Sequence, residues 1–394
     1  MADSPVQPAP KLSQRKLAAT QRGHDFQPLR PADREASISQ LPDDPVDLFH
    51  RFCPESLVEK WVVWTNSWAK HRIEQRANAA DSGKPDDEEE LDDEEEDTSA
   101  PKWVPTTVAE IYIFLAVLIY MGNHPEQRIQ DHWIEDKEPG AGDPTHRIMK
   151  YMTYPRFTQL FRYIRIFDPF DEPADNLSRL LSRVTPWSEH IQQAATDLFQ
   201  PGLNVAVDEC MIRFTGRSNA KVTIPRKPTP EGLKIWVVAD HGYFLRWIFH
   251  LPGQKPEIKF PQEPHEPELA PTQAVVLDLV RRLETNNHHV FFDNLFTTVE
   301  LLRALRRDGN AATGTARTGS GIWEEHRESK LRDNTGKLDW QYNTLKAIPT
   351  SDNLVNQIAW KDNALVLFMT TYFTGLEFED IDTAIEFAAV HGKL

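Results

Sequence analysis

Two aspartates lie in segments that otherwise have the apolar composition of β-strands, where aspartate is unusual. Asp208 stands inside the apolar run 204–214, which has the composition of a β-strand, and Asp293 ends a second such run, 288–293. Because strand interiors disfavour aspartate, either residue alone is better explained as a turn or cap. Together they favour a site for Mg²⁺ or Mn²⁺, since a cation relieves the repulsion between neighbouring carboxylates. Such a pair is the beginning of a two-metal site for phosphodiester chemistry.

Basic residues follow the first aspartate. Between 213 and 236 there are six basic residues against Glu231 alone, a local charge of +5 in a chain of net charge −16. A phosphate backbone needs such neutralising charge, so we expect a DNA contact here rather than an ordinary solvated hairpin. The residues expected to face DNA in this segment are Arg213, Arg217, Lys221, Arg226, Lys227 and Lys234.

A second basic cluster follows Asp293. Its pattern fits a DNA-facing surface and the exposed face of an amphipathic helix equally well. From this cluster, we predict that Arg317 contacts DNA. The cluster consists of Arg303, Arg306, Arg307 and Arg317. The adjacent His288 and His289 are not expected to be a metal-ligand pair, because neighbouring strand residues point to opposite faces, and one of them is expected to pack in the core.

The second half of the chain must position these residues. Its short runs rich in Val, Ile and aromatic residues predict strands, and the spacing between them predicts two helices. In chain order we expect strands at 204–214, 234–240 and 244–251, a helix at 272–284, a strand at 288–293, a helix between the capping box Thr297–Glu300 and Gly309, and a strand at 311–316. Three antiparallel strands, helix, strand, helix, strand is the order of an RNase H-like domain. In that topology the first and fourth strands are neighbours, so Asp208 and Asp293 meet.

The first half is predicted to be helical. Aromatic residues recur at helical spacing in 47–71, and a capping box, Thr107–Glu110, precedes an apolar run that stops at Gly122. Further helices are expected at 156–167 and 185–199. The fold class is therefore α+β or α/β, with a helical N-terminal region followed by an RNase H-like mixed-sheet core that carries an insertion.

The domain organisation follows from composition. Residues 1–44 have no apolar period and are expected to form a disordered tail. Residues 45–200 are expected to form a mainly helical region, with an acidic linker at 80–100. The RNase H-like core covers 201–371, with a polar insertion at 317–347 and a hairpin that turns at Asp362–Asn363. Residues 372–394 are an atypical C-terminal end. The run 86–97 holds eleven acids and is a solvated linker or a protein-binding segment.

Several classes of protein are excluded. The longest apolar stretch, 111–121, is about half of the roughly 20 residues that a membrane helix needs, and the polar start is not a signal peptide. Cys53 and Cys210 are the only cysteines, which excludes a disulfide scaffold or a cysteine-built zinc module and fits a reducing compartment. We expect no membrane partner and no small-molecule substrate.

The chain resembles the transposases of the piggyBac superfamily. The resemblance rests on VDECMIRFTGRSNAKVTIPRKPTPEGLKIWVVAD and HHVFFDNLFTTVELLRALRRDGNAATGTAR, with TNSWA, WVPTTVAEIYIFL and HWIEDKE upstream. It runs from about Phe49 to Thr371, and the combination of motifs is specific. The resemblance implies a DDD transposase that excises an element through hairpin ends and reinserts it at TTAA sites with Mg²⁺. It also implies that Asp208 and Asp293 are the first two catalytic acids, that transposon-end DNA is the partner, and that the protein acts in the nucleus. The helical region 45–200 would then serve DNA binding and dimerisation, and the protein would form a homodimer.

The chain also departs from the family pattern. The family's third catalytic aspartate follows the hairpin 360–369 in a segment with no counterpart here, and the cysteine-rich zinc domain is missing. Asp362 is expected to be a turn residue. The remaining candidates for a third acid are Asp380, Asp382 and Glu386. We therefore expect a C-terminally truncated, transposase-derived protein with vestigial and inactive chemistry. The alternatives are a domesticated DNA- or protein-binding module and a poorly folding gene product.

Overall fold

The computed structural model describes residues 22–82, 102–134, 146–171, 173, 176–225, 227–260 and 268–376. The chain divides into two compact units. The helical unit comprises residues 42–194, and the sheet unit combines residues 22–41 with residues 195–376. None of the helices in these ranges combines the length and apolar character that a membrane span requires.

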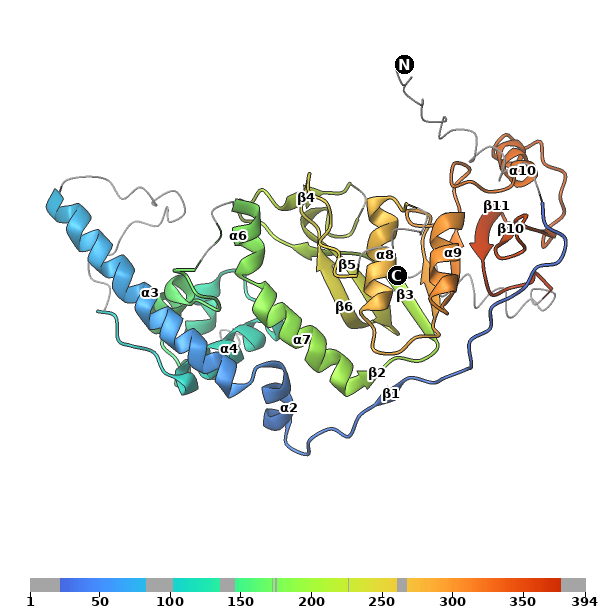
Figure 1. Ribbon diagram of the computed structural model, residues 1–394. Helices are drawn as coiled ribbons and strands as arrows, with labels where there is room; N and C mark the ends of the chain where they lie inside the picture. The colour runs from blue at the N-terminus through green and yellow to red at the C-terminus, as the bar shows by residue number, and fades with distance from the viewer. Residues whose placement is uncertain are drawn as a thin grey trace, which may run out of the picture. The chain divides into compact units, whose positions relative to one another are not determined.

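A nine-stranded mixed sheet forms the sheet unit (Figure 1). Its order is β4-β5-β3-β7-β8-β11-β10-β9, and β6 also pairs with β5. The strands are β3 (Asn204–Arg213), β4 (Lys221–Thr223), β5 (Glu231–Asp240), β6 (Tyr243–Phe249), β7 (His289–Phe292), β8 (Ala311–Thr315), β9 (Leu345–Pro349), β10 (Asn356–Lys361) and β11 (Leu365–Thr370). β3, β5 and β6 form the predicted antiparallel meander. The β5–β6 turn has positive φ at His241 (47°) and Gly242 (82°), as tight hairpin turns require.

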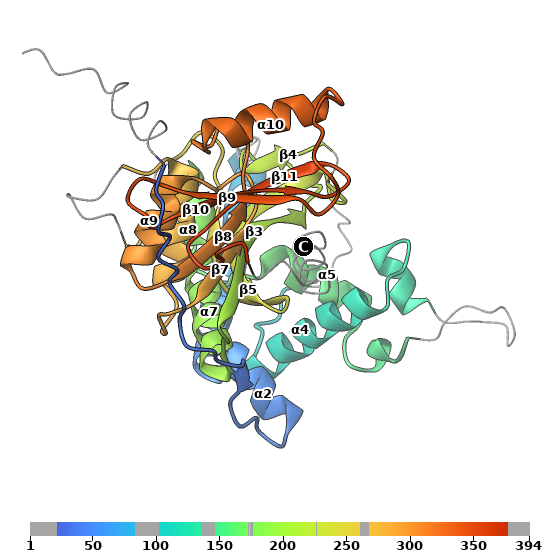
Figure 2. The same ribbon diagram turned by 90° about the vertical axis from the view of Figure 1, so that its right-hand side faces the viewer.

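The predicted contact between the first and fourth strands of the core is confirmed. β3 pairs with β7 in parallel, and β7 pairs with β8 in parallel. Helices α8 (Pro271–Arg281) and α9 (Val299–Arg307) lie together beside these strands, as Figure 2 shows. Their apolar residues, Leu279 and Leu302 among them, pack against Val207 and Val290 in the main core. Burial of this apolar face holds the parallel strands in register.

Two local predictions in this unit need correction. Helix α9 is capped by Thr298, whose Oγ1 accepts a hydrogen bond from Leu301 N, one residue later than the predicted cap at Thr297. The polar insertion 317–347, for which no helix was predicted, contains α10 (Glu324–Asn334). Asp333 near the end of α10 accepts a hydrogen bond from Leu365 N at 2.6 Å, which fixes the helix to β11.

Residues 22–44 are not disordered, in contrast to the prediction for the tail; residues 1–21 lie outside the described part. Backbone hydrogen bonds join Leu29 N to Thr371 O and Leu203 N to Arg34 O, and β1 (Ser37–Ile38) pairs with β2 (Phe199–Gln200). This segment, blue in Figure 1, lies along the sheet unit. Its order comes from backbone pairing rather than from a buried apolar pattern, which is why composition did not reveal it.

The helical unit contains α2 (Pro45–Phe52), α3 (Glu55–Ser82), α4 (Val108–Asn123), η2 (Ile129–Trp133), η3 (Arg147–Lys150), α5 (Tyr154–Tyr163), α6 (Asn176–Ser182) and α7 (Thr185–Leu198, which ends in the sheet unit). Its core contains Trp61 from α3, Phe114 from α4 and Phe157 from α5. The predicted cap at Thr107 is confirmed, because its Oγ1 accepts a hydrogen bond from Glu110 N at 3.3 Å. The acidic linker lies mostly outside the described residues.

Candidate functional site

The two predicted carboxylates come together at one edge of the sheet. In the parallel β3–β7 ladder the last partners are Val207 and Phe292, and Asp208 and Asp293 follow them by one residue on each strand. Val207 and Phe292 both pack in the core, so the next residues on both strands share the opposite face. Asp208, in the middle of β3, and Asp293, directly after β7, therefore lie at the same level and on the same side of the sheet.

Local hydrogen bonds fix each aspartate. The Asp208 Oδ1 accepts from the Glu209 backbone N at 2.7 Å. The Asp293 Oδ1 accepts from Leu295 N at 2.8 Å, and Thr297 Oγ1 donates to the Asp293 carbonyl at 2.9 Å. The turn after β7 thus holds Asp293 in an Asx-type arrangement. Thr297, the predicted helix cap, positions this turn instead.

The electrostatics of Asp208 suit a cation. Burial raises the pKa of Asp208 above its ordinary value, and the nearby negative charges of Asp293 and Glu209 raise it further. The Glu209 backbone N–H and the Lys227 ammonium oppose this rise without overcoming it. A cation bound by both aspartates would remove this penalty, so the donor set fits a hard divalent ion such as Mg²⁺.

The structure brings together two carboxylates that could bind a metal ion. In the described ranges no group of three or more His, Cys, Asp or Glu side chains is arranged to hold a metal ion. Asp362 lies in the β10–β11 turn, where its backbone N donates to Ala364 O, in keeping with its predicted role. The other candidates for a third acid, Asp380, Asp382 and Glu386, lie outside the described residues.

Glu209, which the sequence did not single out, organises the basic residues beside the pair. Its carboxylate lies 3.2 Å from Lys227 Nζ and 2.7 Å from Lys234 Nζ. The Lys234 ammonium also lies 3.7 Å from the centre of the Trp236 ring. Burial disfavours ionisation of Glu209, but the two lysines outweigh it and lower the pKa of this carboxyl group. We call Glu209, Lys227 and Lys234 the lysine clamp.

The remaining basic residues divide into two groups. Arg213 and Arg217 are exposed, as expected for DNA contacts, whereas Lys221 Nζ pairs with Glu231 at 2.5 Å. Arg226 lies outside the described residues.

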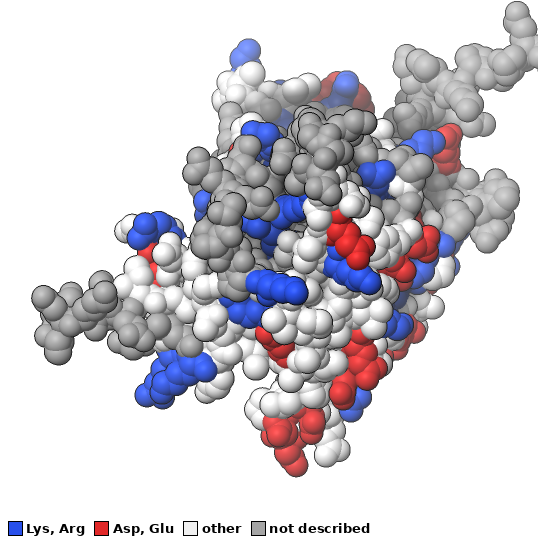
Figure 3. Space-filling view, turned by 90° about the vertical axis from the view of Figure 1, so that its left-hand side faces the viewer, with Lys and Arg blue, Asp and Glu red and all other residues white. Residues whose placement is uncertain are grey.

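Arg317 lies beside the turn that carries Asp293. It is exposed, and its Nε donates at 2.6 Å to Asn294, the neighbour of Asp293. On the face drawn in Figure 3, basic side chains form separate groups rather than one continuous band. The pairs of Lys221 with Glu231 and of Lys227 and Lys234 with Glu209 partly neutralise the charge of +5 counted from the sequence.

Both histidines of the His288–His289 pair are buried. The His288 ring lies within hydrogen-bond distance of Gly202 O and Thr285 O, and His289 Nε2 lies 2.8 Å from Thr313 Oγ1. Strand alternation predicted that one of them packs in the core, whereas both faces of the sheet are covered here and both rings are buried.

A glycine beside the site was also missed. Gly314 of β8 pairs with Phe292, and a Cβ at this position would lie 2.3 Å from Thr297 Oγ1 and 2.6 Å from the Phe292 ring. The close approach of β8 therefore holds both the residue before Asp293 and the threonine that anchors its turn. The sequence signal was the Gly-Thr pair within the predicted strand 311–316.

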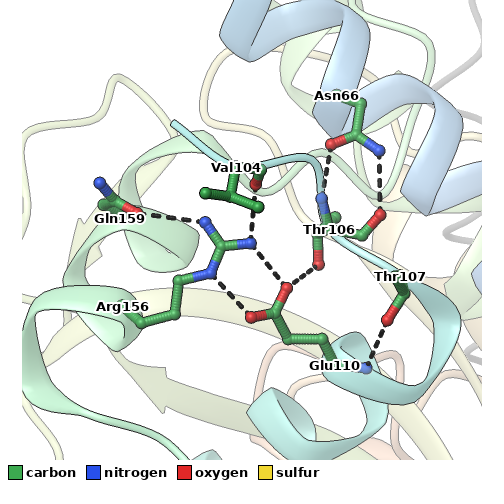
Figure 4. Close-up of polar contacts among 7 residues, drawn as sticks. All are labelled: Asn66, Val104, Thr106, Thr107, Glu110, Arg156 and Gln159. Carbon is green, nitrogen blue, oxygen red and sulfur yellow. Dashed lines mark hydrogen bonds and ion pairs between the residues drawn. The ribbon is translucent and has the colours of Figure 1, made fainter. Parts of the chain in front are cut away.

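The helical unit has a polar network at the start of α4 (Figure 4). The Arg156 guanidinium donates to both Glu110 carboxylate oxygens, at 2.7 and 2.6 Å, and also to Val104 O. Thr106 Oγ1 donates to Glu110. The Asn66 side-chain amide donates to Thr106 O and accepts a hydrogen bond from Thr106 N. The network lines an open groove of about 640 Å³. Since the Arg156 and Glu110 charges satisfy each other, we assign the network a structural role.

Comparisons with known proteins place this fold and site in a class. The family described as Transposase IS4, whose members are DDE transposases, matches residues 44–387. The chain therefore belongs to this family of DDE transposases. The match runs past Thr371, where the resemblance was predicted to end, so Asp380, Asp382 and Glu386 fall within the matched range.

The individual relatives are of the piggyBac type. The human piggyBac transposable element-derived proteins 3 and 2 are 26% and 25% identical over 218 and 219 residues, which is 54% of this chain and 34% of each relative. The chain thus spans about a third of the length of these relatives. A cryo-EM structure of piggyBac transposase in a synaptic complex with hairpin DNA matches with a TM-score of 0.62 and 18% identity, over 86% of this chain and 63% of that chain. The predicted fold class, with its RNase H-like core, is confirmed.

Proposed function

We propose that this transposase-derived protein binds DNA and that Asp208 and Asp293 hold Mg²⁺ or Mn²⁺ at a site for phosphodiester chemistry. The supporting observation is the placement of both carboxylates at the same edge and face of two neighbouring parallel strands. When bound, the metal would supply charge stabilisation at the reacting phosphate. Arg317 and Lys227 contribute positive charge beside the pair.

The DNA partner in this proposal is a transposon end, with TTAA as target. Support comes from the piggyBac relative, whose structure is a synaptic complex with hairpin DNA, and from the exposed Arg213 and Arg217 at and after the end of β3. Action on DNA ends in pairs favours a homodimer, and a DNA substrate favours the nucleus.

The third carboxylate decides how far the chemistry proceeds. The described residues bring together two acids of the expected three. The family match extends to residue 387 and includes Asp380, Asp382 and Glu386. In place of the inactive chemistry expected from the sequence, we therefore propose that DNA binding and metal binding are the core activities and that strand transfer requires one of these three acids.

The test is a nicking and joining assay on a TTAA-flanked hairpin DNA with Mg²⁺ or Mn²⁺. The proteins compared are the unaltered chain, Asp208→Asn, Asp293→Asn and, as a matched control, Asp362→Asn in the turn away from the pair. DNA affinity is measured in parallel. We expect metal-dependent nicking that both site variants lose and the control keeps, and strand transfer that one of Asp380→Asn, Asp382→Asn and Glu386→Gln removes.

The possible results separate the parts of the proposal. DNA binding without any metal-dependent step in any protein would identify a domesticated binding module and overturn the metal site. Strand transfer that survives all three C-terminal substitutions would show that the third acid lies elsewhere. Absence of DNA binding by the unaltered chain would overturn the proposed function as a whole.

A further inference from the structure

A threonine lies next to the two aspartates across the sheet. The parallel β7–β8 ladder ends at Phe292 and Gly314, so the next residues on these two strands are Asp293 and Thr315. Asp208 lies at the same level on the other side of Asp293, because β3 pairs with β7 in the same way. These three residues therefore lie side by side on three adjacent strands. We call Asp208, Asp293 and Thr315 the oxygen row.

The contacts of a neighbouring threonine fix the face on which Thr315 lies. Thr313, two residues earlier on β8, has its Oγ1 2.8 Å from His289 Nε2 on β7. Because alternate residues of a strand share a face, Thr315 lies on the face of His289 and Asp293. The opposite face, which carries Val290, packs in the main core with α8 and α9. The Thr315 side chain therefore lies on the same side of the sheet as the two carboxylates.

Apolar side chains bound the oxygen row at both ends. Asp208 pairs with Val237 in the β3–β5 ladder, and Thr315 pairs with Phe368 in the β8–β11 ladder. Val237 and Phe368 are buried in two separate clusters outside the main core. The order across these five strands is apolar, carboxylate, carboxylate, hydroxyl, apolar. The hydroxyl of Thr315 thus belongs to one polar group with the aspartates.

The Thr315 hydroxyl differs from those around it. The hydroxyls of Thr297, Thr313 and Thr370 all have hydrogen-bond partners inside the protein. Thr315 Oγ1 has none among the residues that the structure describes, and its side chain is partly exposed. Threonine is a good strand former, which by itself would place it in β8. Valine would serve that purpose equally well, so strand propensity does not account for a hydroxyl in the oxygen row.

The spacing of the strands indicates what this hydroxyl can bind. Adjacent strands are about 4.8 Å apart, so Thr315 lies about 5 Å from Asp293 and about 10 Å from Asp208 along the row. Two oxygens on one Mg²⁺ are separated by at most about 4 Å, since each lies about 2.0–2.1 Å from the ion. The short threonine side chain therefore does not reach an ion that both aspartates share. A phosphate group has several acceptor oxygens, so one oxygen can bind the ion while another accepts a hydrogen bond.

We propose that the Thr315 hydroxyl binds a phosphate oxygen of DNA whose phosphate group is also bound to the ion held by Asp208 and Asp293. This inference rests on the proposed function, which supplies both the ion and the DNA. The hydrogen bond from Arg317 Nε to Asn294 Oδ1 ties the segment after β8 to the turn after β7. The hydroxyl is therefore held in place beside the pair, where it orients the phosphate without contributing to metal affinity.

The test measures the affinity for a TTAA-flanked hairpin DNA with and without a divalent ion. Ca²⁺ replaces Mg²⁺ because it also binds carboxylate and phosphate oxygens, and gel electrophoresis verifies that the DNA stays intact. The main variant is Thr315→Val, which keeps the shape and strand propensity and removes the hydroxyl. Thr315→Ser keeps a hydroxyl at the same position. The matched control is Thr223→Val, which removes an exposed hydroxyl from β4.

We expect Ca²⁺ to raise the DNA affinity of the unaltered chain, Thr315→Ser and Thr223→Val by similar factors. Thr315→Val should lose about tenfold of this gain, because a hydrogen bond to a charged group contributes a factor of this order. Without a divalent ion, all four proteins should bind DNA equally.

Calorimetry of Mn²⁺ binding in the absence of DNA provides a second measurement. Thr315→Val and the unaltered chain should bind Mn²⁺ with the same affinity, and their thermal unfolding should coincide. A folding defect would weaken metal binding and DNA binding together, so this combination of results separates a phosphate contact from a structural role.

Two results would overturn the assignment of Thr315 while leaving the proposed function intact. One is an equal Ca²⁺-dependent gain in DNA affinity for Thr315→Val and the unaltered chain. The other is weaker Mn²⁺ binding by Thr315→Val without DNA, which would assign the hydroxyl to the metal site itself. If the unaltered chain shows no Ca²⁺-dependent gain, or if Asp208→Asn keeps the gain, the proposed metal site is wrong and the role of Thr315 is overturned with it.

Discussion

Lys234 Nζ lies 2.7 Å from Glu209 Oε2, across the β3–β5 pair and one residue from Asp208. Both side chains are largely buried, with exposed fractions of 11% and 14%. The Glu209 carboxylate therefore already neutralises part of the positive charge next to the site.

We expect Glu209→Gln to destabilise the protein by about 3 kcal/mol, because it leaves the Lys234 ammonium buried without its counter-ion. Urea unfolding measures this change. The double variant Glu209→Gln with Lys234→Met should recover much of the loss, because it removes the unpaired charge. A single variant as stable as the unaltered chain would show that the lysine clamp contributes nothing to folding.

The lysine clamp also has a pH signature. Because the pKa of Glu209 is lowered in the folded state, its stabilisation is present above the ordinary glutamate range and is lost as pH falls through the folded pKa. Melting temperatures of Glu209→Gln should therefore decline less on acidification below about pH 4 than those of the unaltered chain. Parallel melting curves across this range would contradict the assignment.

Asp208 should behave in the opposite way. Its pKa is raised in the folded state, so without metal stability falls as pH rises from the ordinary aspartate range through the raised pKa. We expect Asp208→Asn to melt on the order of 2 °C higher than the unaltered chain at neutral pH without metal. Added Mg²⁺ should stabilise the unaltered chain alone. A lower melting temperature for the variant would count against repulsion at this site.

Gly314→Ala should disturb the Asp293 turn. Its Cβ would lie 2.3 Å from Thr297 Oγ1 and 2.6 Å from the Phe292 ring, so β7 and the turn must shift, at a cost of about 1–3 kcal/mol. Metal affinity should fall together with stability. Gly319→Ala is the matched control, because nothing lies within 4 Å of its added Cβ. Equal behaviour of the two variants would rule out the proposed packing constraint.

In the helical unit, Arg156→Met should cost about 3 kcal/mol, because Glu110 loses a two-pronged ion pair in a partly buried site. Arg156→Lys should fall between, since lysine keeps the charge but not the planar fork. Arg128→Met is the control, because the arginine of the Arg128–Asp131 pair is 73% exposed and its loss should leave stability nearly unchanged. Chemical denaturation of the three variants provides the ranking.

The sequence revealed the aspartate pair because its signals are local. Apolar runs marked 204–214 and 288–293 as strands, and the order of elements made them neighbours. The lysine clamp depends on strand register instead. Glu209 lies four residues before the basic segment as it was counted from Arg213, and only the β3–β5 pairing brings it to Lys234.

The remaining differences have a similar cause. The helix in the insertion 317–347 is highly charged, and contacts such as Asp333 with Leu365 N hold it in place. Residues 22–44 have no apolar pattern, and backbone hydrogen bonds order them instead. Such tertiary hydrogen bonds are not encoded in the local composition of either partner.

The N-terminal segment pairs with residues that are synthesised much later than the segment itself. Ser37 pairs with Gln200, and Leu29 N donates to Thr371 O, so a segment that leaves the ribosome first must wait for partners made much later. At about 5–20 residues per second the wait is roughly 10–30 s for the first partner and roughly 20–70 s for the second. The entire helical unit is synthesised in the interval. Docking of this segment is therefore complete only after residue 371 has been synthesised, and until then its backbone groups lack these partners and are accessible to chaperones and proteases.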